Sequence, residues 1–197
     1  MANIINRRNT YNMSDIKNLA ILGCTGSIGR QTLSVVDAHP ELFRVRAITA
    51  GSDEKALNEI TAKYSPQYSA LIARDGDEAN VTASMLDSVD TVVIALTGMK
   101  AIFPLRAALK AKKRVALANK ESIVCGGELL KAELDENRER LFPVDSEHSA
   151  LFQCIQGLSS RSEISRLILT ASGGPFREYT RQQLDGVTSA DFLRKDG

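Results

Sequence analysis

Short apolar runs alternate with amphipathic stretches along most of the chain. The apolar runs predict strands at 18–22, 44–50, 68–73, 91–96 and 114–118. Between them, apolar residues recur at helical spacing at 27–38, 54–64, 78–86 and 101–111. Strands that alternate with helices in this way predict βαβ units with right-handed crossovers. The predicted fold class is therefore α/β, a Rossmann-like doubly wound parallel sheet with helices on both faces.

The alternation changes after residue 119. Helices are predicted at 122–140 and 147–156, and strands at 141–144 and 166–171. The last twenty residues or so, 178–197, are polar and show weak helical periodicity. A domain boundary is therefore predicted near residues 140–145, although no Pro/Gly-rich linker marks it.

Composition excludes several classes of protein. Of the 197 residues, 43% are hydrophobic and 25% are charged, which is ordinary for a globular chain. The formal net charge of +1 gives no bulk attraction for nucleic acid, and the lack of Trp argues against a base-stacking platform. No apolar run approaches the ~18 residues of a spanning helix, so we expect no membrane association.

The cysteines and the N-terminal residues 1–17 indicate the cellular compartment of the protein. Cys24, Cys125 and Cys154 are odd in number and widely spaced, and no CxxC is present. This pattern predicts reduced thiols in the cytoplasm. Residues 1–17 are polar and lack the apolar core of a secretory signal, which favours a flexible leader. Arg7 and Arg8 leave a targeting remnant for a plastid-like organelle as the alternative.

A glycine motif, GCTGSIG at 23–29, follows the first predicted strand and opens the first helix. Glycine removes Cβ where the backbone turns tightly and approaches a pyrophosphate, and the helix N-terminus offers free N–H groups. The GxxGxxG spacing differs from GxGxxG, but its position between strand and helix favours dinucleotide binding over a structural turn.

The second predicted strand ends at Gly51-Ser52-Asp53. In Rossmann sheets this position meets the adenosine ribose, where an acid favours NAD and a basic or polar group favours NADP. Asp53 suits the ribose, but Ser52 or Asp53 equally suits the N-cap of the following helix. The sequence leaves both interpretations open.

Two further strand ends carry polar side chains. Lys120 follows the predicted strand 114–118, where it can neutralise an anionic oxygen or can simply lie on the surface. Asp145 and Glu147 are two residues apart after the predicted strand 141–144, so in an extended segment they would project to one side. Such a pair suits Mg²⁺ or Mn²⁺, although a solvated acidic loop is an equal alternative.

The segment Ser172-Gly173-Gly174 follows the predicted strand 166–171. It predicts either an anion-binding nest of backbone N–H groups or a tight turn. Cys125 precedes two glycines, and we interpret it as a structural thiol rather than a nucleophile, because no base can be assigned to it.

Four segments, GCTGSIGRQTL, ALANKES, PVDSEHSALFQ and ASGGPFR, occur in this order. Together they resemble the 1-deoxy-D-xylulose 5-phosphate reductoisomerase family, from about Lys17 to about Ala190. The resemblance implies a homodimeric enzyme of non-mevalonate isoprenoid biosynthesis that acts on a small phosphorylated sugar. It converts 1-deoxy-D-xylulose 5-phosphate to 2-C-methyl-D-erythritol 4-phosphate with NADPH and a divalent metal, Mg²⁺ or Mn²⁺.

The resemblance also implies roles for individual residues. Those expected to bind the cofactor are Thr25, Gly26, Ser27, Ile28, Gly51, Ser52, Asp53, Asn119 and Glu121. Asp145 and Glu147 are expected to ligate the metal. Lys120, Ser146 and Ser172 are expected to contact substrate, with Ser172 near its phosphate. The corresponding domains are a flexible leader over 1–17, a dinucleotide-binding domain over 18–143, and the incomplete start of a catalytic domain over 144–197.

The chain departs from the family in two respects. The family often has Lys or Arg and then Asn after the glycine of the second strand, where Ser52 and Asp53 stand here. The family also continues into a flap, a third metal-binding Glu and a helical domain. We therefore expect an impaired or inactive fragment. The alternatives are a dinucleotide-binding module without catalysis and a semialdehyde-dehydrogenase-like reductase that uses Cys125.

Overall fold

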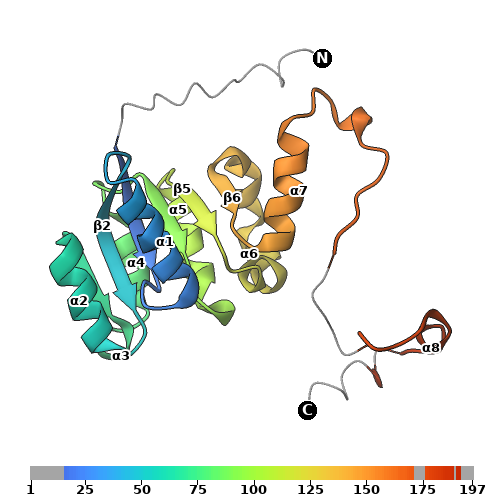
Figure 1. Cartoon of the computed structure of the whole chain (residues 1–197), viewed down its shortest axis with the longest axis horizontal. Helices are drawn as coiled ribbons and strands as arrows, with labels where there is room; N and C mark the ends of the chain where they lie inside the picture. The colour runs from blue at the N-terminus through green and yellow to red at the C-terminus, as the bar shows by residue number, and fades with distance from the viewer. Residues whose placement is uncertain (1–15, 171–175, 189, 192–197) are drawn as a thin grey trace.

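Six parallel strands form one sheet in the order β3-β2-β1-β4-β5-β6 (Figure 1). They are β1 Lys17–Leu22, β2 Phe43–Ala50, β3 Tyr68–Leu71, β4 Thr91–Ile94, β5 Arg114–Leu117 and β6 Leu141–Pro143. The computed structural model describes residues 16–170, 176–188 and 190–191. The strand order is that of doubly wound dinucleotide-binding sheets, so the predicted fold class is confirmed.

Helices connect the strands. The α-helices are α1 Ser27–Ala38, α2 Glu54–Tyr64, α3 Ile72–Asp75, α4 Glu78–Met85, α5 Ile102–Lys110, α6 Glu121–Glu136, α7 Ser146–Gln156 and α8 Arg181–Leu184. Short 3₁₀ turns lie at η1 Gly98–Ala101, η2 Arg138–Arg140 and η3 Arg161–Glu163. The helices predicted at 27–38 and 54–64 match α1 and α2 residue for residue.

The sheet separates two apolar cores because successive side chains of a strand point to opposite faces. On β1, Leu19 and Ile21 pack with apolar side chains of α1 and α2. Ala20 and Leu22 pack on the other face with side chains of α4, α5 and α6. Figure 1 shows α1 and α2 together on one side of the sheet. Burial on both faces explains why the strands read as nearly continuous apolar runs.

Two strands end two residues earlier than their apolar runs predict. The run at 68–73 leaves the sheet after Leu71, because α3 begins at Ile72 and the Asp75 carboxylate accepts a hydrogen bond from Leu71 N at 2.8 Å. The run at 91–96 ends at Ile94. These two carboxyl ends lie at the edge of the sheet where ligands bind in such folds.

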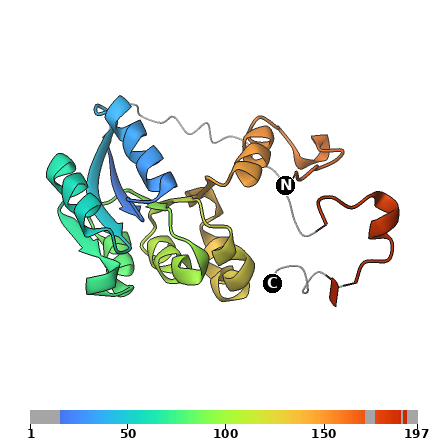
Figure 2. The ribbon, with the colours of Figure 1, turned by 60° about the horizontal axis from the view of Figure 1, so that its bottom comes forward.

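Beyond β6 the chain has little contact with the sheet. Helix α7 packs on β6, with the Phe142 and Phe152 rings edge to face at 6.0 Å. The strand predicted at 166–171 is wrong over 166–170, which forms neither strand nor helix. A strand needs a neighbour for its backbone hydrogen bonds, and here Leu167, Ile168 and Leu169 are exposed. Figure 2 shows the segment after α7 leading away from the sheet.

Some predictions fall outside the described residues. These include nearly all of the leader at 1–17, as well as Ser172 and its glycines. The boundary at 143/144 stays a prediction, although β6 does end at Pro143. Within the described ranges, the helices are too short or too polar to cross a bilayer.

Candidate functional site

The glycine loop lies at the point where the strand order reverses, between β1 and β4. Gly23 has a φ of +82°, and a Cβ there would stand 2.5 Å from the Ala95 carbonyl oxygen. A Cβ on Gly29 would stand 2.3 Å from the Gly23 carbonyl oxygen. Gly26 is different, because it is exposed and its nearest neighbour would be 3.4 Å away. Gly23 and Gly29 therefore shape the loop, and Gly26 leaves its outer face open.

A buried polar network holds this loop against β2. The Thr49 carbonyl oxygen accepts hydrogen bonds from Gly23 N at 3.0 Å and Cys24 N at 2.9 Å. The Thr49 hydroxyl donates to Asn80 Oδ1 on α4 at 2.7 Å. Both side chains are buried. The sequence analysis does not identify this pair. The signal that could have identified it is a polar residue, Thr49, inside an apolar strand and a second one, Asn80, on the apolar face of a helix.

The N-terminus of α1 faces the open side of the loop. Gly26 is the N-cap residue, and no side chain caps the helix there. The Thr25 carbonyl oxygen accepts a hydrogen bond from Arg30 Nε at 2.9 Å. Ser27 is exposed and Ile28 is half-buried. The first turn of a helix has N–H groups without helical partners, and these bind anions. The loop therefore fits a pyrophosphate.

The end of β2 lies beside the loop, and Gly51, Ser52 and Asp53 are all exposed there. Asp53 is the N-cap of α2, and its Oδ1 accepts a hydrogen bond from Ala56 N at 3.0 Å. The N-cap interpretation of Asp53 is therefore confirmed. Contact with a ribose stays a prediction for all three residues.

Asn119 is buried and ties two loops together. Its Nδ2 donates to the Leu96 and Gly98 carbonyl oxygens at 3.0 and 2.9 Å, and its Oδ1 accepts from Ser122 N at 2.8 Å. The side chain thus fixes the loop after β4 to the start of α6. Glu121 is exposed in the first turn of α6.

Lys120 and the two predicted metal ligands meet at the ends of β5 and β6. Lys120 Nζ lies 2.8 Å from Asp145 Oδ2 and 4.0 Å from Glu147 Oε2. The Lys120 ammonium, with help from His148, holds the pKa of Asp145 well below its usual range. Asp145 in turn raises the pKa of Lys120. The cluster is therefore an ionised lysine between two carboxylates.

The geometry behind this cluster differs from the predicted one. Asp145 and Glu147 do not lie in an extended segment, because Asp145 is the N-cap of α7 and Glu147 is in its first turn. His148 contacts the same carboxylate, with Nδ1 2.7 Å from Asp145 Oδ1. Ser146, the first residue of α7, is exposed. The pair still converges on one cation, but it does so from the start of a helix.

A groove of about 690 Å³ lies between α6 and α7, and Lys120, Asp145 and His148 of this cluster line part of it. Apolar side chains such as Leu151 and Phe152 and charged side chains such as Lys131 and Asp135 line the rest. The two carboxylates offer hard oxygen ligands that fit a divalent ion. In the described ranges, however, no three His, Cys, Asp or Glu side chains are arranged to hold one. The pair therefore fits as part of a metal site.

The thiols stand apart from this cluster. Burial raises the pKa of the Cys24 thiol to about 11, so it is protonated and inert at neutral pH. Cys125 is exposed on α6, and the groove is lined by its neighbours Val124 and Gly127 rather than by Cys125 itself. The structure gives the Cys125 nucleophile hypothesis no support.

Comparison with known proteins bears directly on this arrangement. The family model described as 1-deoxy-D-xylulose 5-phosphate reductoisomerase matches residues 19–77 and 71–127. The model of that enzyme's C-terminal domain matches residues 141–195. The chain belongs to the 1-deoxy-D-xylulose 5-phosphate reductoisomerase family. The predicted family is thereby confirmed, and the semialdehyde-dehydrogenase alternative is not favoured.

Individual reductoisomerases agree with this assignment. The enzyme of Bacillus pumilus is 39% identical in an alignment of 196 positions that covers 90% of this chain and 51% of the relative. A solved structure of the Zymomonas mobilis enzyme in complex with NADPH is 32% identical, has a TM-score of 0.68, and is matched over 91% of this chain and 52% of its own length. The chain thus spans about half the length of the reductoisomerases it matches.

A second solved reductoisomerase, in complex with NADPH, fosmidomycin and magnesium, is 30% identical with a TM-score of 0.71. It is matched over 89% of this chain and 50% of its own length. The likeness covers both the sheet and the segment that follows it.

Proposed function

We propose that this chain provides the cofactor-binding part and some of the metal-binding part of a reductoisomerase. The reaction is the NADPH-dependent conversion of 1-deoxy-D-xylulose 5-phosphate to 2-C-methyl-D-erythritol 4-phosphate, in non-mevalonate isoprenoid biosynthesis. When bound, NADPH supplies a hydride, and Mg²⁺ or Mn²⁺ acts as a Lewis acid on substrate oxygens. Solved relatives carry NADPH and magnesium, which supports both cofactors.

The residues proposed to hold the cofactor share one edge of the sheet. The uncapped first turn of α1, with Thr25, Gly26, Ser27 and Ile28, would bind the pyrophosphate. Gly51, Ser52 and Asp53 at the end of β2 would lie beside the adenosine ribose. Asn119 and Glu121 follow β5 on the same edge, where Asn119 would shape the nicotinamide side through its bonds to Leu96 and Gly98.

One observation carries the proposal. Lys120, after β5, lies between Asp145 and Glu147, after β6, on the edge that also bears the glycine loop. This arrangement supports a cation site of two carboxylates beside the proposed cofactor cleft. Lys120 would neutralise charge on the substrate during the rearrangement, and Ser146 would contact substrate from the start of α7. Ser172 is proposed to contact the substrate's phosphate, on the resemblance alone.

Titration with reduced cofactors tests the proposal. The nicotinamide emission of NADPH and of NADH is followed as this chain is added, with Mn²⁺ and substrate turnover measured separately. We expect NADPH to bind and turnover to be slow or absent, because the described residues provide two metal carboxylates and no third. Failure to bind either nucleotide would contradict the proposal. Binding of NADPH without any binding of Mn²⁺ would favour a dinucleotide-binding module.

Gly26→Asp separates binding from folding. The backbone of Gly26 (φ −75°, ψ 173°) accepts any side chain, and Asp is a good N-cap, so we expect stability to be kept. The new carboxylate would occupy the pyrophosphate position and repel the negatively charged pyrophosphate. The Kd for NADPH should therefore rise by about 100-fold or more. Thermal melting and the nicotinamide titration measure the two effects.

The control for Gly26→Asp is Gly157→Asp. It adds the same charge at the end of α7, where a Cβ meets nothing within 4 Å. We expect it to leave the Kd for NADPH unchanged. If Gly26→Asp binds NADPH as the unmodified chain does, the glycine loop is only a structural turn.

Other properties of the family are carried as predictions. A homodimer is expected for the full-length enzyme, and sedimentation of that enzyme would test it. The cytoplasm is the expected compartment. The matched relatives are bacterial, such as that of Bacillus pumilus, and give no support to a plastid-like location.

A further inference from the structure

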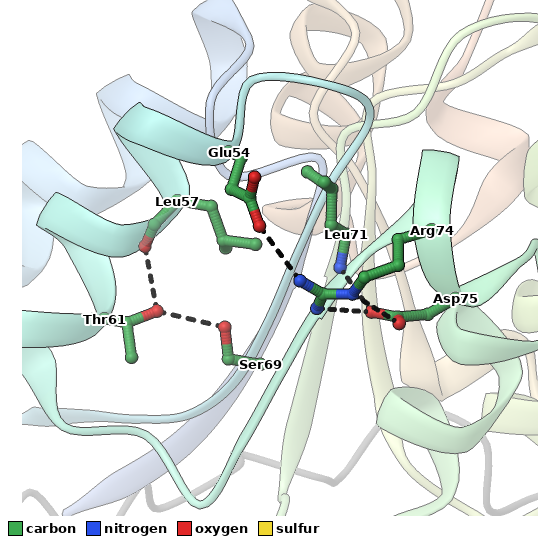
Figure 3. A network of polar contacts seen from close by, with 7 residues as sticks. All are labelled: Glu54, Leu57, Thr61, Ser69, Leu71, Arg74 and Asp75. Atoms are coloured by element: carbon green, nitrogen blue, oxygen red, sulfur yellow. Dashed lines mark hydrogen bonds and ion pairs between the residues drawn. The ribbon is translucent and has the colours of Figure 1, made fainter.

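An arginine lies beside the end of β2, where the adenosine ribose is expected. Arg74 is on α3, directly after β3, the neighbour of β2 in the sheet. The two loops are joined, because Ala73 N donates a hydrogen bond to the Gly51 carbonyl oxygen at 2.9 Å. Figure 3 shows the Arg74 guanidinium reaching the first turn of α2. Sequence analysis did not single out this residue.

The guanidinium is held by two carboxylates. Its Nε and Nη2 donate to Asp75 Oδ1 and Oδ2 at 2.8 and 2.9 Å, and its Nη1 donates to Glu54 Oε1 at 3.0 Å (Figure 3). Asp75 is itself fixed by a bond from Leu71 N at 2.8 Å. These bonds use three of the five guanidinium N–H groups, and the side chain is 58% exposed. Arg74 is therefore oriented and still open to a ligand.

The scaffold around Arg74 is also tied together. Thr61 on α2 donates from its hydroxyl to the Leu57 carbonyl oxygen at 2.8 Å and lies 3.0 Å from the Ser69 hydroxyl on β3 (Figure 3). This contact joins α2 to β3. The distance between Arg74 and the first turn of α2 is thus set by packed elements, not by a free loop.

The ribose end needs a cation if NADPH is the cofactor, because the 2′-phosphate that distinguishes it from NADH is an anion. Gly51, Ser52 and Asp53 supply a hydroxyl and a carboxylate but no positive charge. Arg74 contacts Glu54, the residue next to Asp53. This inference rests on the proposed function. We infer that Arg74 binds the 2′-phosphate of NADPH and supplies the positive charge that is missing from the residues after Gly51.

The carboxylates facing this position have different roles. Asp53, Glu54 and Asp75 together oppose a phosphate, so its binding requires a strong local cation. Asp75 is pinned to the backbone of β3 and orients the guanidinium fork. Glu54 is 57% exposed and is held by a single bond, so a phosphate can displace it from Nη1. An arginine binds phosphate with two parallel N–H groups, which favours this exchange.

The test compares NADPH with NADH on matched variants. Arg74→Gln should raise the Kd for NADPH by about 10- to 100-fold and leave the Kd for NADH within about twofold. Arg74→Lys keeps the positive charge but lacks the paired N–H groups of arginine. Its Kd for NADPH should lie between those of the unmodified chain and of Arg74→Gln. Glu54→Gln removes the carboxylate that competes with the phosphate for Arg74. It should lower the Kd for NADPH by about threefold and leave the Kd for NADH unchanged. Lys63→Gln removes the same charge at the far end of α2 and should change neither.

Each other outcome decides against the inference. If Arg74→Gln weakens both nucleotides equally, its effect is on folding or on the general shape of the cleft. If it leaves NADPH unchanged, or if the unmodified chain binds the two nucleotides equally, Arg74 does not read the 2′-phosphate. If the unmodified chain binds neither nucleotide, the proposed function fails, and this inference fails with it.

Discussion

A Gly29→Ala chain is expected to lose about 3 kcal/mol of unfolding free energy, which lowers the Tm by roughly 6–12 °C. The added Cβ would stand 2.3 Å from the Gly23 carbonyl oxygen and 2.6 Å from Cys24 Cα. Both are backbone atoms, and the Gly23 and Cys24 amides are bonded to the Thr49 carbonyl oxygen. The loop has no flexible side chain to move aside, so α1 must separate from β1. Denaturant unfolding of both chains measures the difference.

Gly127→Ala is the matched control for this substitution. Gly127 is inside α6, and a Cβ there meets nothing within 4 Å. Alanine in an exposed helix interior is favoured over glycine, so we expect a gain of about 0.5–1 kcal/mol. If Gly29→Ala unfolds at the same denaturant concentration as the unmodified chain, α1 is not packed against the loop as described.

Replacing Lys120 by methionine is expected to tighten Mn²⁺ binding by about tenfold. The ammonium lies 2.8 Å from Asp145 and 4.0 Å from Glu147, so a metal that uses both carboxylates must displace it. The attraction between these opposite charges favours the ion pair over the metal. Lys120 is 49% exposed, so solvent screening keeps the expected gain in Mn²⁺ affinity modest.

The electron spin resonance of free Mn²⁺ measures this affinity without relying on turnover. Lys131→Met is the control, because its ammonium lies in the same groove, 3.6 Å from Asp135, and away from the two carboxylates. Its Mn²⁺ affinity should match that of the unmodified chain. A weaker affinity in Lys120→Met would mean that Lys120 organises the carboxylates for the metal and does not compete with it.

Most of the fold could be predicted from the sequence because both faces of the sheet are buried. Residues such as Val92 and Ile94 are fully covered, and their apolar run marks the strand whatever its neighbours are. The ends of strands are harder to predict. The run at 68–73 stays apolar through Ile72 and Ala73, yet α3 begins at Ile72 and the Asp75 carboxylate accepts a hydrogen bond from Leu71 N. The run at 166–170 is apolar too, but a strand also requires a partner.

The site could be predicted in its residues more than in its geometry. Position at the ends of strands drew attention to Lys120, Asp145 and Glu147, although their contacts cross 25 or more residues and follow no periodicity. Asp145 and Glu147 follow a strand, so their spacing predicts an extended segment. The helix start that replaces it depends on the N-cap bond from His148 N to the Asp145 carboxylate. Arg74 carries no motif, because its environment is made by tertiary packing.

The burial of Cys24 gives the protein an internal reporter. Cys125 and Cys154 are exposed, so a thiol reagent should modify these two in the folded chain and reach the third only when the core opens. A pKa near 11 also leaves Cys24 with little reactive thiolate at neutral pH. Because Cys24 N is bonded to Thr49, its alkylation rate measures how often the glycine loop detaches from β2. A dinucleotide bound in the cleft should therefore slow the alkylation of the Cys24 thiol.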